Sequence, residues 1–166
     1  HELSNTYHRY NETFFWHACE KPRTAVVDHI LNIYDLWKHN LRINDIVVEI
    51  ACENGNDKLL NLLYTRYTHK LNIHETEEYG FSYACANGHI STVKLMFQIA
   101  DELKSPIDIH VFDDWTFSHT CGNGHIEIVQ YLYEKSIELN DPIYVNTNND
   151  EPFKLACENG HLEIAK

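Results

Sequence analysis

Cysteine and histidine are the residues of this sequence whose types most directly suggest chemistry. The chain has five cysteines and twelve histidines, which could form disulfides, hold zinc or supply a nucleophile. An odd number of cysteines argues against a closed disulfide framework, and no pair has the Cys-x-x-Cys spacing of a zinc knuckle. The sequence also lacks a His-Glu-x-x-His motif, a nucleophile elbow, a phosphate-binding loop and a dinucleotide fingerprint. We therefore expect no catalytic residue, no metal site and no cofactor.

The even spacing of the cysteines indicates an internal repeat instead. They are separated by 33, 33, 36 and 36 residues, at Cys19, Cys52, Cys85, Cys121 and Cys157. Other positions repeat in the same register. A large apolar residue lies four positions before each cysteine, at Phe15, Val48, Phe81, Phe117 and Phe153, and a small residue directly precedes it. Three positions after the cysteine lies a glycine, at Gly55, Gly88, Gly124 and Gly160, and the exception is Pro22 after Cys19.

Each repeat predicts two helices. The apolar, small and cysteine positions share one face of a first helix, which the glycine ends because it accepts a left-handed conformation. A second apolar stripe follows, for example Ile126, Val129 and Leu132, and then a polar linker. One such pair cannot bury its own apolar face, but stacked pairs can.

Stacking also decides what the cysteines can do. Equivalent atoms of neighbouring repeats should lie roughly 8–10 Å apart, too far for a disulfide or a shared zinc ion. We therefore expect the cysteine column to pack as small apolar residues and to remain free thiols, which suits a reducing, intracellular location.

The last sixteen residues carry a family resemblance. The run Glu151-Pro152-Phe153-Lys154-Leu155-Ala156-Cys157-Glu158-Asn159-Gly160-His161-Leu162-Glu163-Ile164-Ala165-Lys166 resembles the ankyrin-repeat pattern T-P-L-H-x-A-A-x-x-G-H-L-E-I-V-K. The repeats rich in Ala-Cys-x-Asn-Gly-His are similar to the divergent arrays encoded by very large DNA viruses and some protists. The resemblance implies an all-α ankyrin-repeat solenoid of stacked antiparallel helix pairs with projecting finger loops. It also implies protein binding without catalysis.

The register divides the chain as a single array over residues 1–166. We expect an atypical repeat at approximately 8–40, further repeats at 41–73, 74–109 and 110–145, and an incomplete one at 146–166. The incomplete repeat should expose Phe153, Ala156 and Ile164 at its end. We therefore expect that the natural chain continues or that something packs end to end against this repeat.

The charge balance limits the class of partner. The chain has 13 Lys and Arg against 25 Asp and Glu, a formal net charge of −12. Such a chain is repelled by phosphate backbones and gains nothing from anionic membranes, so we expect neither a nucleic acid nor a membrane as partner. The expected location is intracellular: cytoplasmic, in a host cell or in a virion.

An acidic position seven residues before each cysteine is the strongest surface signal. It is occupied by Glu12, Asp45, Glu78, Asp114 and Asp150. The first interpretation is that each acid caps the free N–H groups of the first helix, with Asn or Asp before it taking a left-handed turn. The second is an acidic ridge that faces a basic protein partner. The two are compatible.

Further residues extend this partner-binding candidate. Glu20 and Glu53 follow the cysteines directly, and the aromatic residues Trp16, Phe112 and Trp115 lie on the first helix or in the fingers. Exposed aromatics often anchor protein partners, although they could equally fill gaps between fingers. His89, His125 and His161 take the structural Gly-His position of the repeat. The scattered histidines, such as His74 and His110, are expected to be ordinary surface residues.

These observations predict a non-enzymatic protein–protein interaction module that binds on its finger and first-helix surface. One alternative is a structural component of a larger assembly such as a virus particle. Another is the substrate-recruiting arm of a ubiquitin-ligase adaptor, although no F-box-like segment is visible.

Overall fold

The computed structural model of the chain describes residues 17–19, 23–36, 45–67, 72–74 and 78–166. These residues form helices and turns, and no strand occurs among them. In chain order the helices are α2 (Thr24–Leu36), α3 (Asp45–Glu53), α4 (Asp57–Tyr67), α5 (Tyr79–Ala86), α6 (Ile90–Leu103), α7 (Trp115–Gly122), α8 (Ile126–Glu138), α9 (Thr147–Glu158) and α10 (Leu162–Ala165). Of the helices in these ranges, not one combines the length and the apolar character required to traverse a bilayer.

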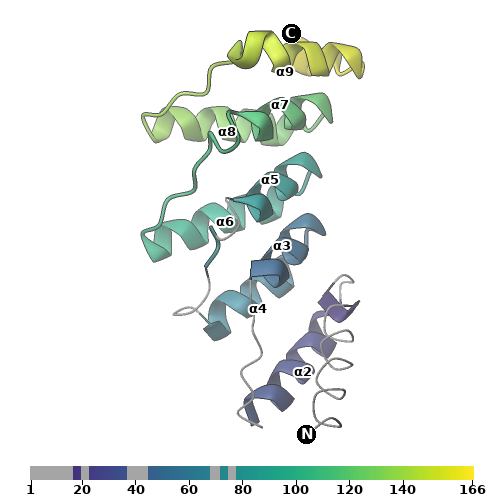
Figure 1. Ribbon diagram of the computed structural model, residues 1–166, viewed down its shortest axis with the longest axis vertical. Coiled ribbons are helices and arrows are strands. Elements are labelled where there is room, and N and C mark those ends of the chain that lie inside the picture. The colour runs from purple at the N-terminus through teal and green to yellow at the C-terminus, as the bar shows by residue number, and fades with distance from the viewer. Residues whose placement is uncertain (1–16, 20–22, 37–44, 68–71, 75–77) are drawn as a thin grey trace, which may run out of the picture.

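The helices form two layers that run the length of the molecule. In the first layer α3, α5, α7 and α9 pack side by side, and in the second α2, α4, α6, α8 and α10 do the same. Each first-layer helix also packs against the helix that follows it in the chain. The pairs succeed one another in chain order along the long axis (Figure 1). The predicted all-α solenoid of stacked helix pairs is confirmed.

The core lies between and within the layers. The apolar position four residues before cysteine is buried at Val48, Phe81 and Phe117, and the position eleven after it is buried at Leu63, Met96 and Leu132. In α8 the buried apolar residues are Ile128 and Leu132, whereas the expected Ile126 and Val129 are only half-buried. Small polar residues fill the seam between α5 and α7, where the hydroxyls of Ser82 and Thr116 lie 2.7 Å apart.

The cysteine column packs in this core. No disulfide joins the five cysteines, all of which lie in the described residues, and Cys19, Cys52, Cys85 and Cys121 are buried. Burial raises the pKa of Cys85 well above its ordinary value and that of Cys121 to about 12. At Cys52 burial raises the pKa, and the negative charges of Asp57 and Glu49 add to the effect. These thiols are therefore neutral and unreactive near neutral pH.

Cys157 departs from the column because it is exposed. We expect iodoacetamide to modify Cys157 first in the folded chain, and Cys52, Cys85 and Cys121 far more slowly, because the reactive species is an accessible thiolate. Peptide mass spectrometry over a labelling time course would measure the order. Equal labelling of Cys85 and Cys157 in the folded chain would contradict the buried column.

The turns between paired helices are held by the next repeat. Gly55, Gly88 and Gly124 have φ of 61°, 81° and 81°, and a Cβ at any of them would lie within 3.0 Å of the ring of the following repeat's His89, His125 or His161. The His89 Nε2 donates to the Glu53 carbonyl at 2.9 Å, and the His125 Nε2 donates to the Ala86 carbonyl at 3.0 Å. The Gly-His position is thus structural, as predicted.

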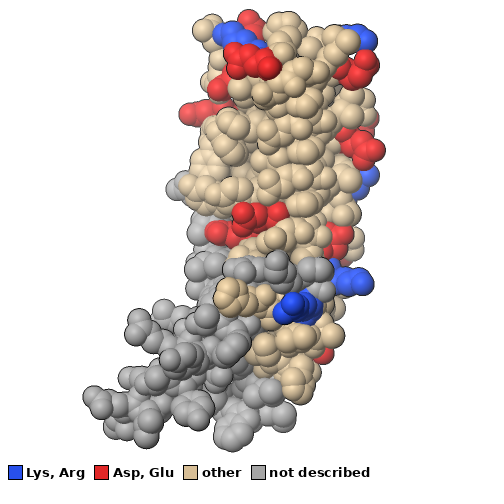
Figure 2. Space-filling view, turned by 90° about the vertical axis from the view of Figure 1, so that its right-hand side faces the viewer, with Lys and Arg blue, Asp and Glu red and all other residues tan. Residues whose placement is uncertain are grey.

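An asparagine supports the same carbonyl in each turn. Asn87 Nδ2 donates to the Glu53 carbonyl at 3.1 Å and Asn123 Nδ2 to the Ala86 carbonyl at 2.7 Å. Asn159 repeats the bond at the Gly122 carbonyl, at 2.7 Å. The turns therefore form a ladder of asparagine bonds to backbone carbonyls. On this side of the molecule a broad area shows no charged residue, and acidic and basic side chains lie along its edge (Figure 2).

The last repeat differs in part from expectation. Phe153 is 53% exposed, as predicted, but Ala156 is fully buried and Ile164 is half-buried. The prediction that Ala156 is exposed is wrong, because α9 packs against both α7 and α10. The regular part of α9 begins after Asp150, since Asn148, Asn149 and Asp150 have φ of 48°, 68° and 61°.

Candidate partner-binding surface

The structure divides the predicted binding residues into buried and exposed groups. Glu78 and Asp114 are 5% and 8% exposed, and Phe112 is half-buried. Glu53 and Asp150 are exposed, as is Trp115 at 36%. Asp45 begins α3. Glu12, Trp16, Glu20 and the side chain of Asp45 lie outside the described residues.

The two buried acids do not cap helices with their side chains. Glu78 and Asp114 precede α5 and α7 with φ of 63° and 62°, and neither carboxylate accepts a bond from the helix N–H groups. The capping interpretation is therefore wrong for both. Left-handed geometry does precede the acids, as predicted, at Asp113 (φ 54°) and Asn149 (φ 68°). The acids themselves share that geometry, so their side chains turn away from the helix ends.

Each buried acid instead pairs with a histidine of its own finger. Nδ1 of His74 lies 2.6 Å from Glu78 Oε1, and Nδ1 of His110 lies 2.6 Å from Asp114 Oδ1. His74 and His110 are only about a quarter exposed in their side chains, so the expectation of ordinary surface histidines is wrong for them. The repeated spacing His-x-x-x-acid is visible in the sequence and could have revealed these pairs.

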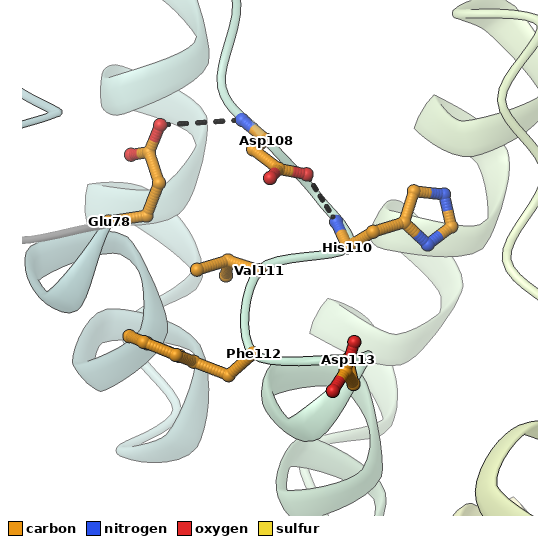
Figure 3. A pocket seen from close by; sticks show the side chains of 6 residues that line it. All are labelled: Glu78, Asp108, His110, Val111, Phe112 and Asp113. Atoms are coloured by element: carbon orange, nitrogen blue, oxygen red, sulfur yellow. Dashed lines mark hydrogen bonds between the residues drawn. The ribbon is translucent and has the colours of Figure 1, made fainter.

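The same acids join one finger to the next. Glu78 Oε1 also accepts the backbone N–H of Asp108 at 3.3 Å (Figure 3), and Asp114 Oδ2 accepts the Thr147 hydroxyl at 2.8 Å. Each of these donors belongs to the following finger. Glu78 and Asp114 therefore order successive fingers along the stack.

His110 gives this link a dependence on pH. Partial burial lowers the pKa of His110, but its bonds to Asp114 and Asp141 and their negative charges outweigh that effect, so its pKa lies above the ordinary value. Because the pKa is raised in the folded state, the stabilisation is complete below the unfolded pKa and is lost as pH rises through the folded pKa.

We therefore expect His110→Gln to destabilise the array more at about pH 6 than at about pH 8. Urea unfolding of both chains at each pH would measure the difference. Asn32→Gln, on the second layer, is a control whose effect should not change with pH. A His110→Gln effect that is constant or grows toward pH 8 would contradict the ion pair.

Lys and Arg are partitioned between the layers, whereas acids occur in both. The acids of α4, α6 and α8 are Asp57, Asp101, Glu102, Glu127, Glu134 and Glu138. Helices α3, α5 and α7 and finger residues 105–114 contain no Lys or Arg. Their acids are Asp45, Glu49, Glu53, Asp108, Asp113 and Asp114, with Glu78 directly before α5. The second-layer helices α4, α6 and α8 carry Lys58, Arg66, Lys94 and Lys135, and Lys154 is a base on the first layer, in α9. The first-layer side is therefore anionic over three consecutive repeats.

Aromatic side chains lie on this anionic side. Tyr79 and Tyr83 of α5 stack with centroids 5.8 Å apart, and Phe112 of the next finger packs on Tyr79 at 5.0 Å. On α7, Trp115 stacks on His119 at 3.9 Å. Tyr79 and Tyr83 are 41% and 37% exposed. Phe112 and Trp115 thus take part in partly exposed aromatic clusters, and sequence reasoning missed Tyr79 and Tyr83.

A hollow of about 440 Å³ adjoins the aromatic cluster. It is lined by Glu78, Asp108, His110, Val111, Phe112 and Asp113 (Figure 3). Phe112 belongs to both features, since it lines the hollow and contacts Tyr79. No group of His, Cys, Asp and Glu in the described ranges has the arrangement needed to hold a metal ion.

Comparison with known families agrees with the repeat architecture. A family model described as "Ankyrin repeats (3 copies)" matches residues 48–143 and, in an overlapping match, residues 81–166. No curated protein was found to match the chain.

Proposed function

Because this chain belongs to the ankyrin-repeat family, we propose that it is a non-enzymatic module that binds a basic protein partner on its finger and first-helix surface. Ankyrin repeats indicate a protein–protein interaction module, and the family is typically non-enzymatic. The observation that carries the proposal is the distribution of basic residues, which leaves α3, α5, α7 and the finger at 105–114 without a Lys or Arg to offset their acids.

Electrostatics favours this partner over other classes. A net charge of −12 opposes binding to nucleic acid or an anionic membrane and accelerates encounter with a basic protein. The partly exposed Trp115 and Phe112 supply apolar contact area, and aromatic residues are enriched at the centres of protein interfaces. Five cysteines without a disulfide among them support an intracellular, reducing location.

The buried acids take an indirect part in this proposal. Glu78 and Asp114 position the fingers, while Glu53 and Asp150 offer accessible charge. Glu12, Asp45 and Glu20 remain proposed members of the surface by their register, as does Trp16.

The test is the rate at which a basic peptide, (Lys-Arg-Gly-Ser)₃, associates with the chain in stopped flow. We expect Glu53→Gln with Asp150→Asn to slow association and flatten its salt dependence, because steering acts on the encounter rate. The matched control, Glu127→Gln with Glu134→Gln, removes the same charge from exposed positions of α8. Equal slowing by both pairs would show that only net charge matters and would contradict the proposed face.

End-to-end packing at the last repeat is a second proposal, supported by the exposure of Phe153 at 53% and Leu162 at 63%. Sedimentation velocity over a concentration series would show a growing sedimentation coefficient if copies associate there. Phe153→Ser with Leu162→Ser should then abolish the growth, and a concentration-independent monomer would refute the packing.

A further inference from the structure

We infer that the surface formed by Tyr83, Tyr79, Phe112 and the adjoining hollow recognises an arginine side chain of the protein partner. This inference rests on the proposed function, because it names the partner chemistry for the same face. The inference rests on one observation: Phe112 belongs both to an aromatic platform, formed with Tyr79 and Tyr83, and to the lining of an anionic hollow.

The platform offers aromatic faces to a cation. Tyr79 stacks on Tyr83 with an interplanar angle of 22° and meets Phe112 at 44°, so the three rings form an uninterrupted surface. Tyr79 and Tyr83 are each more than a third exposed. A guanidinium stacks on such faces and is more weakly hydrated than an ammonium, which lowers the cost of removing it from water.

The hollow supplies carboxylates beside the platform. Asp108 and Asp113 are exposed, and Asp113 makes no side-chain bond within the described residues. Glu78 stands on the wall of the hollow (Figure 3), with a side chain only 7% exposed. No hydrogen bond to its Oε2 is made by the described residues, so this buried carboxylate keeps an acceptor that a cationic donor can satisfy.

No Lys or Arg of the described chain lines the hollow. His110 also lines it, but its ring is held between Asp114 and Asp141, so a positive charge there is already matched. The ligand that best fits the platform and the hollow together is a planar cation that stacks on Phe112 and forms paired hydrogen bonds to a carboxylate. Arginine meets both requirements, whereas lysine presents a compact, strongly hydrated charge.

The experiment compares two capped peptides of equal charge, (Gly-Ser-Arg)₃ and (Gly-Ser-Lys)₃. Binding to the chain is followed by NMR titration, which gives both the affinity and the residues perturbed. We expect the arginine peptide to bind about fivefold more tightly, with perturbations at Tyr79 and Asp113. Tyr79→Leu and Asp113→Asn should each reduce the arginine preference toward one, and Asn tolerates the left-handed backbone of position 113.

Matched controls separate this site from general effects. Tyr133→Leu removes a 44% exposed tyrosine from α8, and Glu127→Gln removes an acid from the same helix. Both should leave the preference unchanged. Equal affinity for the two peptides, still weakened by Glu53→Gln with Asp150→Asn, would overturn the arginine site and leave the proposed function standing. If the two peptides bind with equal affinity and no first-layer variant changes that affinity, both the arginine site and the proposed function are overturned.

Discussion

Gly88→Ala should lower the free energy of unfolding of the array by about 2–3 kcal/mol. This figure adds the cost of placing an alanine in a left-handed conformation to the loss of an inter-repeat hydrogen bond. Gly88 has φ 81°, and an added Cβ would lie 2.6 Å from Cε1 of His125. That ring cannot move freely, because its Nε2 donates to the Ala86 carbonyl at 3.0 Å. Urea unfolding followed by circular dichroism would measure the change.

Gly160 provides the matched control for this substitution. It has a nearly identical φ of 79°, but no atom of the described residues lies within 4 Å of a Cβ there. Gly160→Ala should therefore cost only the strain of a left-handed alanine, about 1–2 kcal/mol. If both substitutions destabilise the array equally, the histidine contact does not contribute to stacking. If His125→Ala relieves part of the Gly88→Ala effect, the coupling is direct.

Much of the fold could be predicted because the cysteine register carries several independent positions at once. Val48, Phe81 and Phe117 are buried where the spacing places them, since one helix face must meet the neighbouring repeat. The Gly-His turns follow for the same reason, because their backbone conformation and their inter-repeat contact both require glycine. Periodicity reports these features directly.

The roles of the acids could not be predicted in this way. A carboxylate at a helix start usually caps the helix, and the sequence does not show that Glu78 and Asp114 adopt a left-handed backbone. That conformation turns each carboxylate toward a histidine four residues earlier, in the finger rather than on a helix. The aromatic cluster also depends on the path of the finger, which brings Phe112 onto Tyr79 across 33 residues of sequence.

The histidine–carboxylate pairs of Glu78 and Asp114 change how the acidic ridge can act in binding. Because Glu78 and Asp114 bond to the following finger, neutralising them would alter finger position as well as surface charge. A loss of binding in such variants would therefore mix two causes. Exposed acids such as Glu53 and Asp150 separate the electrostatic contribution from finger geometry.

Cys85→Leu is the second large effect that we expect, with a destabilisation of about 1–3 kcal/mol from overpacking. Cys85 is fully buried, and its helix α5 packs between α3 and α7. The neighbouring seam is close-packed without a void, since a Cβ at Gly80 would lie in van der Waals contact with Cys52 Sγ, at 3.4 Å. A leucine at position 85 would thus have to push two stacked helices apart, whereas Cys85→Ala removes one sulfur atom and should cost less.

The same substitution at the exposed end of the column tests the explanation. Cys157 occupies the equivalent register position but is exposed, so Cys157→Leu adds volume where nothing must move. We expect it to leave the urea midpoint almost unchanged, while Cys85→Leu lowers it clearly. A leucine tolerated equally at both positions would mean that the column is not compressed between repeats. Destabilisation at both positions would point instead to a requirement for the thiol itself, which Cys85→Ala would then reproduce.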